Sequence, residues 1–223
     1  MRRPGASLPQ LVIFDCDGVL VDSEVISNDV LARMLTDEGL PTTLAEARRC
    51  YQGLLLSEVL DSAEARLGRS LPDGWLARYE RERAEAFGRE LRPVPGAART
   101  VELAVTAGLN VCVASQGKLE KTRLSLELTG LRHLFGDRAL FSASCVARGK
   151  PHPDLFLHAA GAMGVAPSAC VVVEDTPSGV KAAAAAGMRA LGYAADSDEA
   201  ALRRAGAEVL WSLDELPRRL GFG

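Results

Sequence analysis

The chain has 223 residues, and its 48% of hydrophobic residues can form a sizeable core, in one large domain or one domain with a smaller insert. A formal net charge of -3 argues against a nucleic-acid-binding protein, whose affinity depends on a basic surface. The five cysteines are scattered without metal-ligand spacing, so we expect small buried thiols in a reducing compartment and no disulfide framework. We expect a cytoplasmic protein without transmembrane segments, because Asp15 interrupts the first apolar run.

The first apolar run ends in two acidic residues and a glycine. Residues 11–14 are apolar without alternation, which is typical of a strand covered on both faces. Asp15 and Asp17 then point to the same side, because side chains alternate along a strand, and Gly18 permits a backbone turn close to them. Two carboxylates at this spacing require a cation. The alternative is an ordinary turn, because Asp and Gly also end many strands.

A helical stretch follows the first strand. Residues 23–38 have apolar side chains at helical spacing, and amphipathic segments follow at residues 44–56, 58–67 and 73–89. No strand pattern interrupts these segments. The charge run at residues 78–92 alternates in sign, which favours a solvated helix face over a binding surface.

From residue 93 onward, short β-branched runs alternate with helical segments. Strands are predicted at residues 111–114, 139–141, 170–173 and 190–193, with an edge strand at residues 208–211. Helices are predicted at residues 97–107, 119–128, 154–163 and 180–186. This alternation is typical of right-handed βαβ units that form a parallel sheet. We therefore predict an α/β fold with a doubly wound parallel sheet and a helical insert after the first strand.

The ends of the predicted strands carry residues that suit a divalent cation. In open parallel sheets, ligands bind outside the carboxyl ends of the strands. Mg²⁺ prefers carboxylate and carbonyl oxygens, so the expected ligands are Asp15, the carbonyl of Asp17, and Asp175. Glu174 is expected to contact the residues around the metal without binding the metal itself.

A second set of residues at the strand ends suits phosphate. The hydroxyl of Ser115 and the backbone N–H groups of Gln116 and Gly117 could bind a phosphate oxygen near a helix start. A serine and a glycine after a strand more often form a helix cap. Lys150 begins a loop before a predicted helix. It is either a fixed cation at this edge of the sheet or, as is more common for a lysine, an exposed side chain.

The order and spacing of these residues resemble the four motifs of the haloacid dehalogenase superfamily of phosphohydrolases. The matching positions are Asp15-x-Asp17-Gly18, Ser115, Lys150-Pro151 and Glu174-Asp175. The flanking strings Phe-Asp-Cys-Asp-Gly-Val-Leu-Val-Asp-Ser-Glu and Val-Glu-Asp-Thr-Pro-Ser-Gly resemble the branch that contains β-phosphoglucomutase, phosphoglycolate phosphatase and sugar-phosphate phosphatases. The resemblance implies a Rossmann-like core of residues 1–22 and 93–223 and a small helical cap of residues 23–92.

The resemblance also implies roles in a reaction. Asp15 would be the nucleophile that forms an aspartyl-phosphate, and Asp17 would be the general acid and base. Mg²⁺ and Lys150 would offset the repulsion between the Asp15 carboxylate and a phosphate dianion.

The cap is expected to contribute to substrate binding. Arg48 and Arg49 lie, with Gln52 and Gly53, in a cap loop that faces the active site in this family, which makes Arg49 a candidate substrate-binding residue. The mutase pattern has an arginine shortly after the cap glycine, where this chain has three leucines at residues 54–56. This difference disfavours a mutase.

We expect a Mg²⁺-dependent phosphatase of a small phosphorylated metabolite, a sugar or sugar-acid phosphate, acting as a monomer or small homo-oligomer. No nucleic-acid or membrane partner is expected. One alternative is a phosphosugar mutase of the β-phosphoglucomutase type. Another is a receiver-like signalling module phosphorylated on Asp15, although such a module needs no lid over its acceptor. A dehalogenase is disfavoured because Asp17 and Asp175 supply a metal site that its chemistry does not use.

Overall fold

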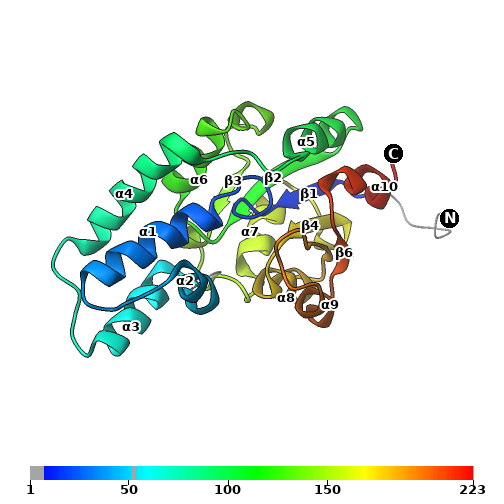
Figure 1. Ribbon diagram of the computed structural model, residues 1–223. Helices are drawn as coiled ribbons and strands as arrows, with labels where there is room; N and C mark the ends of the chain where they lie inside the picture. Colours follow the sequence, from blue (N-terminus) through cyan, green and yellow to red (C-terminus); the bar gives the residue numbers. More distant parts are fainter. Residues whose placement is uncertain (1–7, 52–53, 223) are drawn as a thin grey trace. The chain divides into compact units, whose positions relative to one another are not determined.

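The computed structural model describes residues 8–51 and 54–222 (Figure 1). The chain divides into two compact units. One is built from Met1–Val21 and Pro93–Gly223, and the other from Asp22–Arg92. Because the second unit lies within the sequence of the first, the first unit is assembled from two separate stretches of chain.

A parallel sheet of six strands, counted over the described residues, forms the centre of the first unit. Its strands are β1 (Leu11–Phe14), β2 (Asn110–Ser115), β3 (Leu140–Ser142), β4 (Cys170–Glu174), β5 (Arg189–Tyr193) and β6 (Glu208–Leu210). Their spatial order is β3-β2-β1-β4-β5-β6. The chain therefore builds outward from β1 on one side, through β2 and β3, and then on the other side through β4. This reversal places the expected ligand crevice at the carboxyl ends of β1 and β4.

Helices cover both faces of the sheet. On one face lie α5 (Ala97–Thr106), α6 (Leu119–Leu128) and α10 (Leu216–Leu220). On the other face lie α7 (Asp154–Ala162), α8 (Pro177–Ala185) and α9 (Glu199–Ala205), as Figure 1 shows. Each helix that connects two parallel strands follows a right-handed path. The direction in which the chain moves along the sheet therefore decides which face the helix covers. The predicted α/β class with a doubly wound parallel sheet is confirmed.

The strands are buried because their side chains are apolar on both faces. All residues of β1 have no exposed surface, and β4 is buried along its whole length. This burial accounts for the continuous Val and Ile runs that predicted a fully covered strand. Short 3-10 turns complete the unit: η1 (Arg132–Leu134), η2 (Ala143–Cys145), η3 (Pro167–Ala169) and η4 (Leu213–Glu215).

Helix α8 differs from its prediction for a local reason. Helix α8 begins at Pro177, three residues before the predicted start at residue 180. Thr176 caps this helix, because its side chain accepts a hydrogen bond from the Gly179 N–H at 3.1 Å. Proline suits the first helical position because that position needs no N–H donor.

In the part of the second unit that the structure describes, the regular elements are helices joined by loops. It contains α1 (Glu24–Asp37), α2 (Leu44–Tyr51), α3 (Leu56–Leu67) and α4 (Trp75–Glu90). Helix α2 therefore ends before the predicted end at residue 56, and Gln52 and Gly53 lie outside the described residues. The rings of Trp75 and Tyr79 stack with centroids 5.8 Å apart inside this unit.

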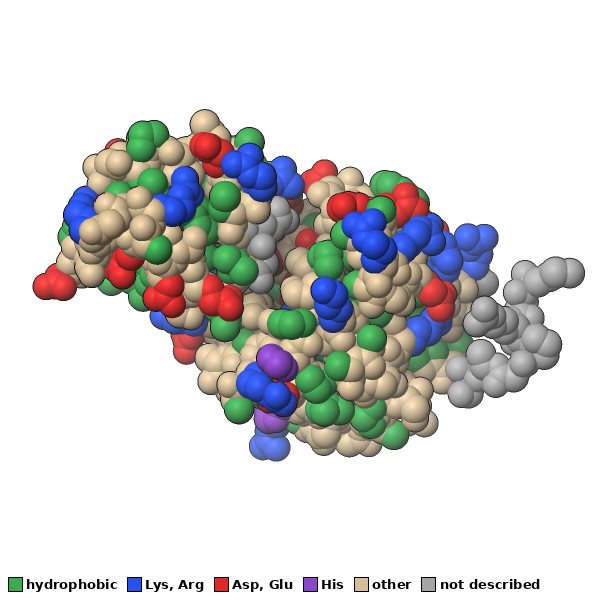
Figure 2. All heavy atoms as spheres, turned by 90° about the horizontal axis from the view of Figure 1, so that it is seen from below, with side chains coloured by type: hydrophobic (Ala, Val, Ile, Leu, Met, Phe, Trp, Pro, Cys, Tyr) green, Lys and Arg blue, Asp and Glu red, His purple; other side chains and the backbone are tan. Residues whose placement is uncertain are grey.

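The charged residues of α4 form ion pairs on the surface of the second unit. Arg78 pairs with Glu82 at 2.8 Å, and Arg33 of α1 reaches the same glutamate at 2.7 Å. These surface ion pairs fit the predicted solvated helix face. On the face of the molecule drawn in Figure 2, Lys and Arg side chains are likewise interspersed with Asp and Glu.

The cysteines and the helices bear on two further expectations. All five cysteines are free, but Cys50 and Cys145 are exposed, so the prediction of burial was wrong for these two. In the described part of the chain, every helix is too short or too polar to cross a membrane.

Candidate active site

Asp15 continues β1 at the carboxyl edge of the sheet. Its backbone N–H donates to the carbonyl of Val173 at 2.9 Å, which extends the pairing of β1 with β4 by one residue. The buried carboxyl group of Asp15 therefore lies beside the end of β4, where Glu174 and Asp175 follow Val173.

Gly18 brings the loop after β1 against Asp175. Its φ of 75° lies in the left-handed region that favours glycine. A Cβ atom at this position would come within 2.1 Å of Asp175 Oδ2. The predicted backbone turn at Gly18 is thus confirmed, and the sequence needs glycine here for both conformation and space.

Lys150 joins the two strand ends through a buried ammonium group. Its Nζ lies 2.6 Å from Asp15 Oδ1, 2.6 Å from Glu174 Oε1 and 3.1 Å from the carbonyl oxygen of Ala114. These contacts match the three donors of an ammonium group. Burial opposes the charge on Lys150, but Asp15 and Glu174 outweigh it and raise the pKa of this lysine. Lys150 therefore stays protonated.

The surroundings of Asp15 disfavour the ionised form of its carboxyl group. Burial is the largest influence and raises its pKa, and the charges of Glu174 and Asp17 act in the same direction. Lys150 acts in the opposite direction but does not cancel burial. A further cation beside Asp15 would favour the ionised carboxylate.

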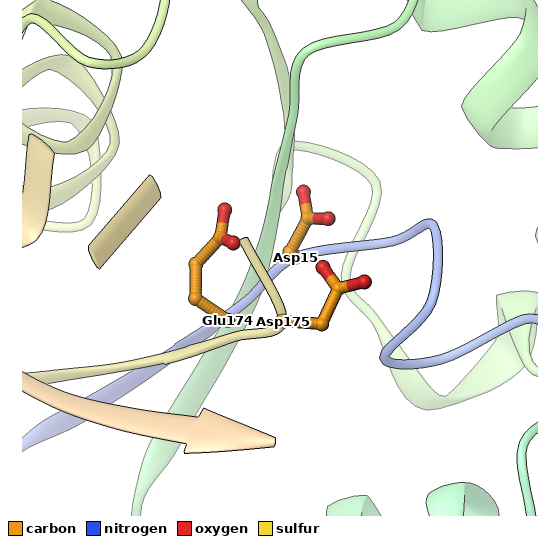
Figure 3. A group of neighbouring side chains, drawn as sticks. All are labelled: Asp15, Glu174 and Asp175. Atoms are coloured by element: carbon orange, nitrogen blue, oxygen red, sulfur yellow. The ribbon is translucent and has the colours of Figure 1, made fainter. Parts of the chain in front are cut away.

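The carboxyl groups of Asp15, Glu174 and Asp175 lie next to one another, as Figure 3 shows. One oxygen from each residue lies within 4.8 Å of the others, and all three residues are buried. This all-oxygen donor set is of the kind that Mg²⁺ prefers. Because Gly18 has no Cβ, the Asp175 carboxyl group can lie directly against the loop after β1. The three buried carboxyl groups therefore fit a hard divalent cation by the chemistry of their oxygens.

Both carboxylate oxygens of Glu174 are already bound by groups of the protein. Its Oε1 binds Lys150, and its Oε2 accepts hydrogen bonds from the N–H and the hydroxyl of Thr176 at 2.9 and 2.8 Å. The side chain is therefore suited to orienting Lys150. The place of Glu174 behind the metal ligands remains a prediction.

Polar groups in the loop after β2 form hydrogen bonds with other groups of the protein. The N–H of Gly117 donates to Ser115 Oγ at 3.1 Å, and the Ser115 hydroxyl donates to Asp17 Oδ2 at 3.5 Å. The phosphate-binding role of Ser115, Gln116 and Gly117 remains a prediction.

The carboxyl group of Asp17 has a charged partner of its own. Its Oδ1 forms an ion pair with Lys121 of α6, and both side chains are largely buried. Asp17 therefore contributes no carboxylate to the group formed by Asp15, Glu174 and Asp175.

A family model described as a haloacid dehalogenase-like hydrolase matches residues 9–187. The chain belongs to this family. It is 32% identical over 209 residues to a 6-phosphogluconate phosphatase of Escherichia coli (strain K12), covering 93% of each chain. It is 36% identical over 190 residues to hexitol phosphatase B of the same organism, covering 80% of this chain and 81% of the relative. A solved structure of a HAD family hydrolase from Deinococcus radiodurans R1, with bound phosphate and sodium, is 33% identical with a TM-score of 0.79, covering 96% of each chain.

Membership of this hydrolase family confirms the resemblance seen in the sequence. Together with the phosphatase relatives, it makes the protein a phosphoric monoester hydrolase. The first unit holds the positions that matched the family motifs, from Asp15 through Asp175, at one edge of its sheet.

Sequence reasoning missed Lys121 in this hydrolase. The residue lies inside a helix that was predicted with its observed bounds, but its pairing with Asp17 joins positions 104 residues apart in sequence. A signal was present, because Lys121 follows Ser115 by only six residues and so belongs to the first turn after the strand edge.

The expected cap residues lie in the other unit. Arg48 and Arg49 occupy the last turn of α2, followed by Gln52 and Gly53 outside the described residues. A role for Arg49 in substrate binding remains a prediction.

Proposed function

We propose that this hydrolase is a Mg²⁺-dependent phosphatase that releases inorganic phosphate from a sugar or sugar-acid phosphate through an aspartyl-phosphate on Asp15. The main support is the buried contact of 2.6 Å between Asp15 and Lys150 at the carboxyl edge of the sheet. The printed names of two relatives, 6-phosphogluconate phosphatase and hexitol phosphatase B, support this substrate class.

In the proposed reaction, Asp15 attacks the phosphorus atom and the bond to the leaving oxygen breaks. Lys150 holds the Asp15 carboxyl group in a fixed orientation and offsets the repulsion between this group and the phosphate. Water then attacks the aspartyl-phosphate, and the new P–O bond replaces the bond to Asp15. The nucleophile is thereby restored.

Asp17 is the proposed proton carrier. It would donate a proton to the leaving alkoxide in the first step and accept one from water in the second. Its carboxyl group lies outside the cluster of Asp15, Glu174 and Asp175, and it contacts Ser115 and Lys121 instead. A carboxyl group that is not committed to a metal can carry a proton.

Asp15 and Asp175 would hold Mg²⁺, with the carbonyl of Asp17 as a further ligand. When bound, the ion would supply positive charge that offsets the negative charge of the substrate phosphate. Glu174 would act indirectly, because both of its oxygens are already held by Lys150 and Thr176.

We further propose that the second unit is a cap that selects the substrate, with Arg49 among its binding residues. Among the described residues of this unit, the regular elements are helices α1 to α4, and these elements and their position after β1 support this role. The residues of the proposed chemistry all belong to the first unit, so substrate selection can be varied separately.

The test is to measure phosphate release from 6-phosphogluconate, hexitol phosphates and β-glucose 1-phosphate, with Mg²⁺ and with EDTA. A catalytic amount of glucose 1,6-bisphosphate is added to the reaction with β-glucose 1-phosphate. We expect inorganic phosphate from at least one metabolite only when Mg²⁺ is present. Stoichiometric glucose 6-phosphate with little free phosphate would indicate a mutase, and a stable phosphoryl group on Asp15 without turnover would indicate a receiver-like module.

A further inference from the structure

The side chain of Gln116 contacts the backbone on both sides of Lys150. Its Oε1 accepts a hydrogen bond from the Lys150 N–H at 3.0 Å, and its Nε2 approaches the Lys150 carbonyl oxygen at 3.5 Å. The carboxamide thus pairs with the main chain of Lys150 as a neighbouring strand would. The orientation of the amide follows from the Lys150 N–H, which needs an acceptor.

Gly149 provides the space for this contact. A Cβ atom at position 149 would lie 2.7 Å from Gln116 Nε2 and 2.9 Å from Oε1, both closer than real Cβ contacts allow. The carbonyl of Gly149 also accepts a hydrogen bond from the His152 N–H at 3.0 Å, so residues 149–152 form a tight turn. The Gln116 carboxamide therefore packs against the start of the turn that presents Lys150.

The end of β2 consequently holds Lys150 at two points. The carbonyl of Ala114 accepts a hydrogen bond from Nζ, and Gln116 binds the backbone of the same residue. A lysine side chain has several rotatable bonds, and fixing it in one position costs conformational entropy. Anchoring both ends limits where Nζ can lie, and Nζ is the atom that reaches Asp15 and Glu174.

We propose that Gln116 is a positioning residue that acts through its side chain to hold the Lys150 turn in the reactive geometry. This proposal rests on the proposed role of Lys150 in catalysis. It assigns the Gln116 side chain a task separate from phosphate binding, which the sequence indicated only for its backbone N–H. A positioning residue should affect kcat, whereas a side chain that binds substrate should affect KM.

The experiment combines Gln116→Ala with Gly149→Ala in a double-mutant cycle, using p-nitrophenyl phosphate at saturating Mg²⁺. Gln116→Ala removes both contacts to Lys150. Gly149→Ala introduces a methyl group that displaces the Gln116 carboxamide, which is the far end of a flexible side chain. In the double variant, the methyl group occupies the space that Gln116 has vacated.

We expect each single variant to lower kcat about ten- to a hundredfold, with KM within about threefold of the wild type. The double variant should retain at least the activity of Gln116→Ala, because both changes remove the same contact. Matched controls are Gln10→Ala at an exposed glutamine and Gly161→Ala at a glycine with no atom within 4 Å of its Cβ position. Both controls should keep the wild-type kcat.

Three results would overturn the proposal: a wild-type kcat for Gln116→Ala, a change in KM alone, or single-variant losses that multiply in the double variant. If Gln116→Ala does not fold, the kcat of Gly149→Ala decides whether the proposal holds. Circular dichroism of Gly149→Ala shows whether that variant is folded. Lys150→Ala is measured in parallel. Near-wild-type activity of Lys150→Ala would reject the proposed mechanism, whereas an inactive Lys150→Ala beside a normal Gln116→Ala would reject only the inference.

Discussion

At the scale of single residues, the candidate active site is a set of buried charges that depend on one another. Lys150 lies between Asp15 and Glu174 at 2.6 Å from each, and all three side chains are nearly inaccessible to solvent. Removing one member of such a group leaves the others buried without full compensation, which is strongly destabilising. Substitutions that keep the shape of a side chain and change only its chemistry are therefore the most informative.

Asp15→Asn is expected to leave the fold intact and to lower kcat by about a thousandfold or more, because an amide is a poor nucleophile. Lys150 keeps its contacts with Glu174 and Ala114 in this variant. Circular dichroism and steady-state hydrolysis of p-nitrophenyl phosphate measure the two properties. The exposed Asp196→Asn is the matched control and should behave as the wild type. Retention of a substantial rate by pure Asp15→Asn would reject Asp15 as the nucleophile.

Asp175→Asn and Glu174→Gln are expected to differ in their metal requirement. Asp175→Asn should raise the Mg²⁺ concentration for half-maximal activity by about a hundredfold, with partial recovery of rate at high Mg²⁺. Glu174→Gln should instead lower the rate at saturating Mg²⁺, because Lys150 loses the charge of one of its two carboxylate partners. Activity is titrated against Mg²⁺ for both variants. The assignment is wrong if Glu174→Gln raises the metal requirement further than Asp175→Asn does.

At the scale of secondary structure, the start of α8 fixes one of these carboxyl groups. Thr176 binds Glu174 Oε2 through its N–H and hydroxyl while its side chain caps the helix. Gly179 lies on the first turn of the helix, directly against the Glu174 carboxyl group. Thr176 and Gly179 thus link the start of α8 to the carboxyl group of Glu174.

Gly179→Ala should therefore disturb the site, although alanine is the better helix former. The added Cβ would lie 1.9 Å from Glu174 Cδ, so the carboxyl group must move. We expect a loss of about 1–3 kcal/mol in the free energy of unfolding and a lower kcat. Gly161→Ala in α7 has no atom near its Cβ position and should be neutral or stabilising by up to about 1 kcal/mol. Urea unfolding and p-nitrophenyl phosphate hydrolysis measure both variants, and equal stability of the two would contradict the steric argument.

Elements with a strong local pattern could be predicted from the sequence. The bounds of β1 and α6 match their predictions, because a fully apolar strand and an amphipathic helix have distinct periods. Helices α9 and α10 were not predicted, since seven and five residues are too few for a clear period. The early start of α8 was readable in principle, because Thr176 and Pro177 are a favourable cap and first residue.

At the scale of the whole molecule, the grouping of Asp15 with Glu174 and Asp175 could be predicted, but the contacts around these residues could not. Carboxyl ends of parallel strands share one edge, so Asp15, Ser115 and Asp175 were expected together from topology alone. The Lys121 ion pair and the Gln116 contact with Lys150 depend on how separate loops pack, over 104 and 34 residues of sequence. No local pattern encodes such pairings.

The connection between the two units permits a test of their independence. Val21 and Pro93 form an antiparallel bridge, and the Val94 N–H donates to the Leu20 carbonyl at 3.0 Å. The chain therefore leaves the first unit and returns to it along adjacent backbone segments. A short Gly/Ser linker of hairpin length can join Val21 to Pro93 in place of residues 22–92.

We expect this shortened chain to fold and to unfold cooperatively, because the first unit contains the complete six-stranded sheet of the described residues and both sets of covering helices. It keeps Asp15, Asp17, Lys150 and Asp175, so it should still hydrolyse p-nitrophenyl phosphate when Mg²⁺ is added. Discrimination among sugar phosphates should be lost if residues 22–92 select the substrate. The ratios of kcat/KM across the metabolite panel measure this loss, with the Asp15→Asn version of the shortened chain as the blank. Unchanged ratios in a folded shortened chain would remove substrate selection from the second unit and assign it to the edge of the sheet.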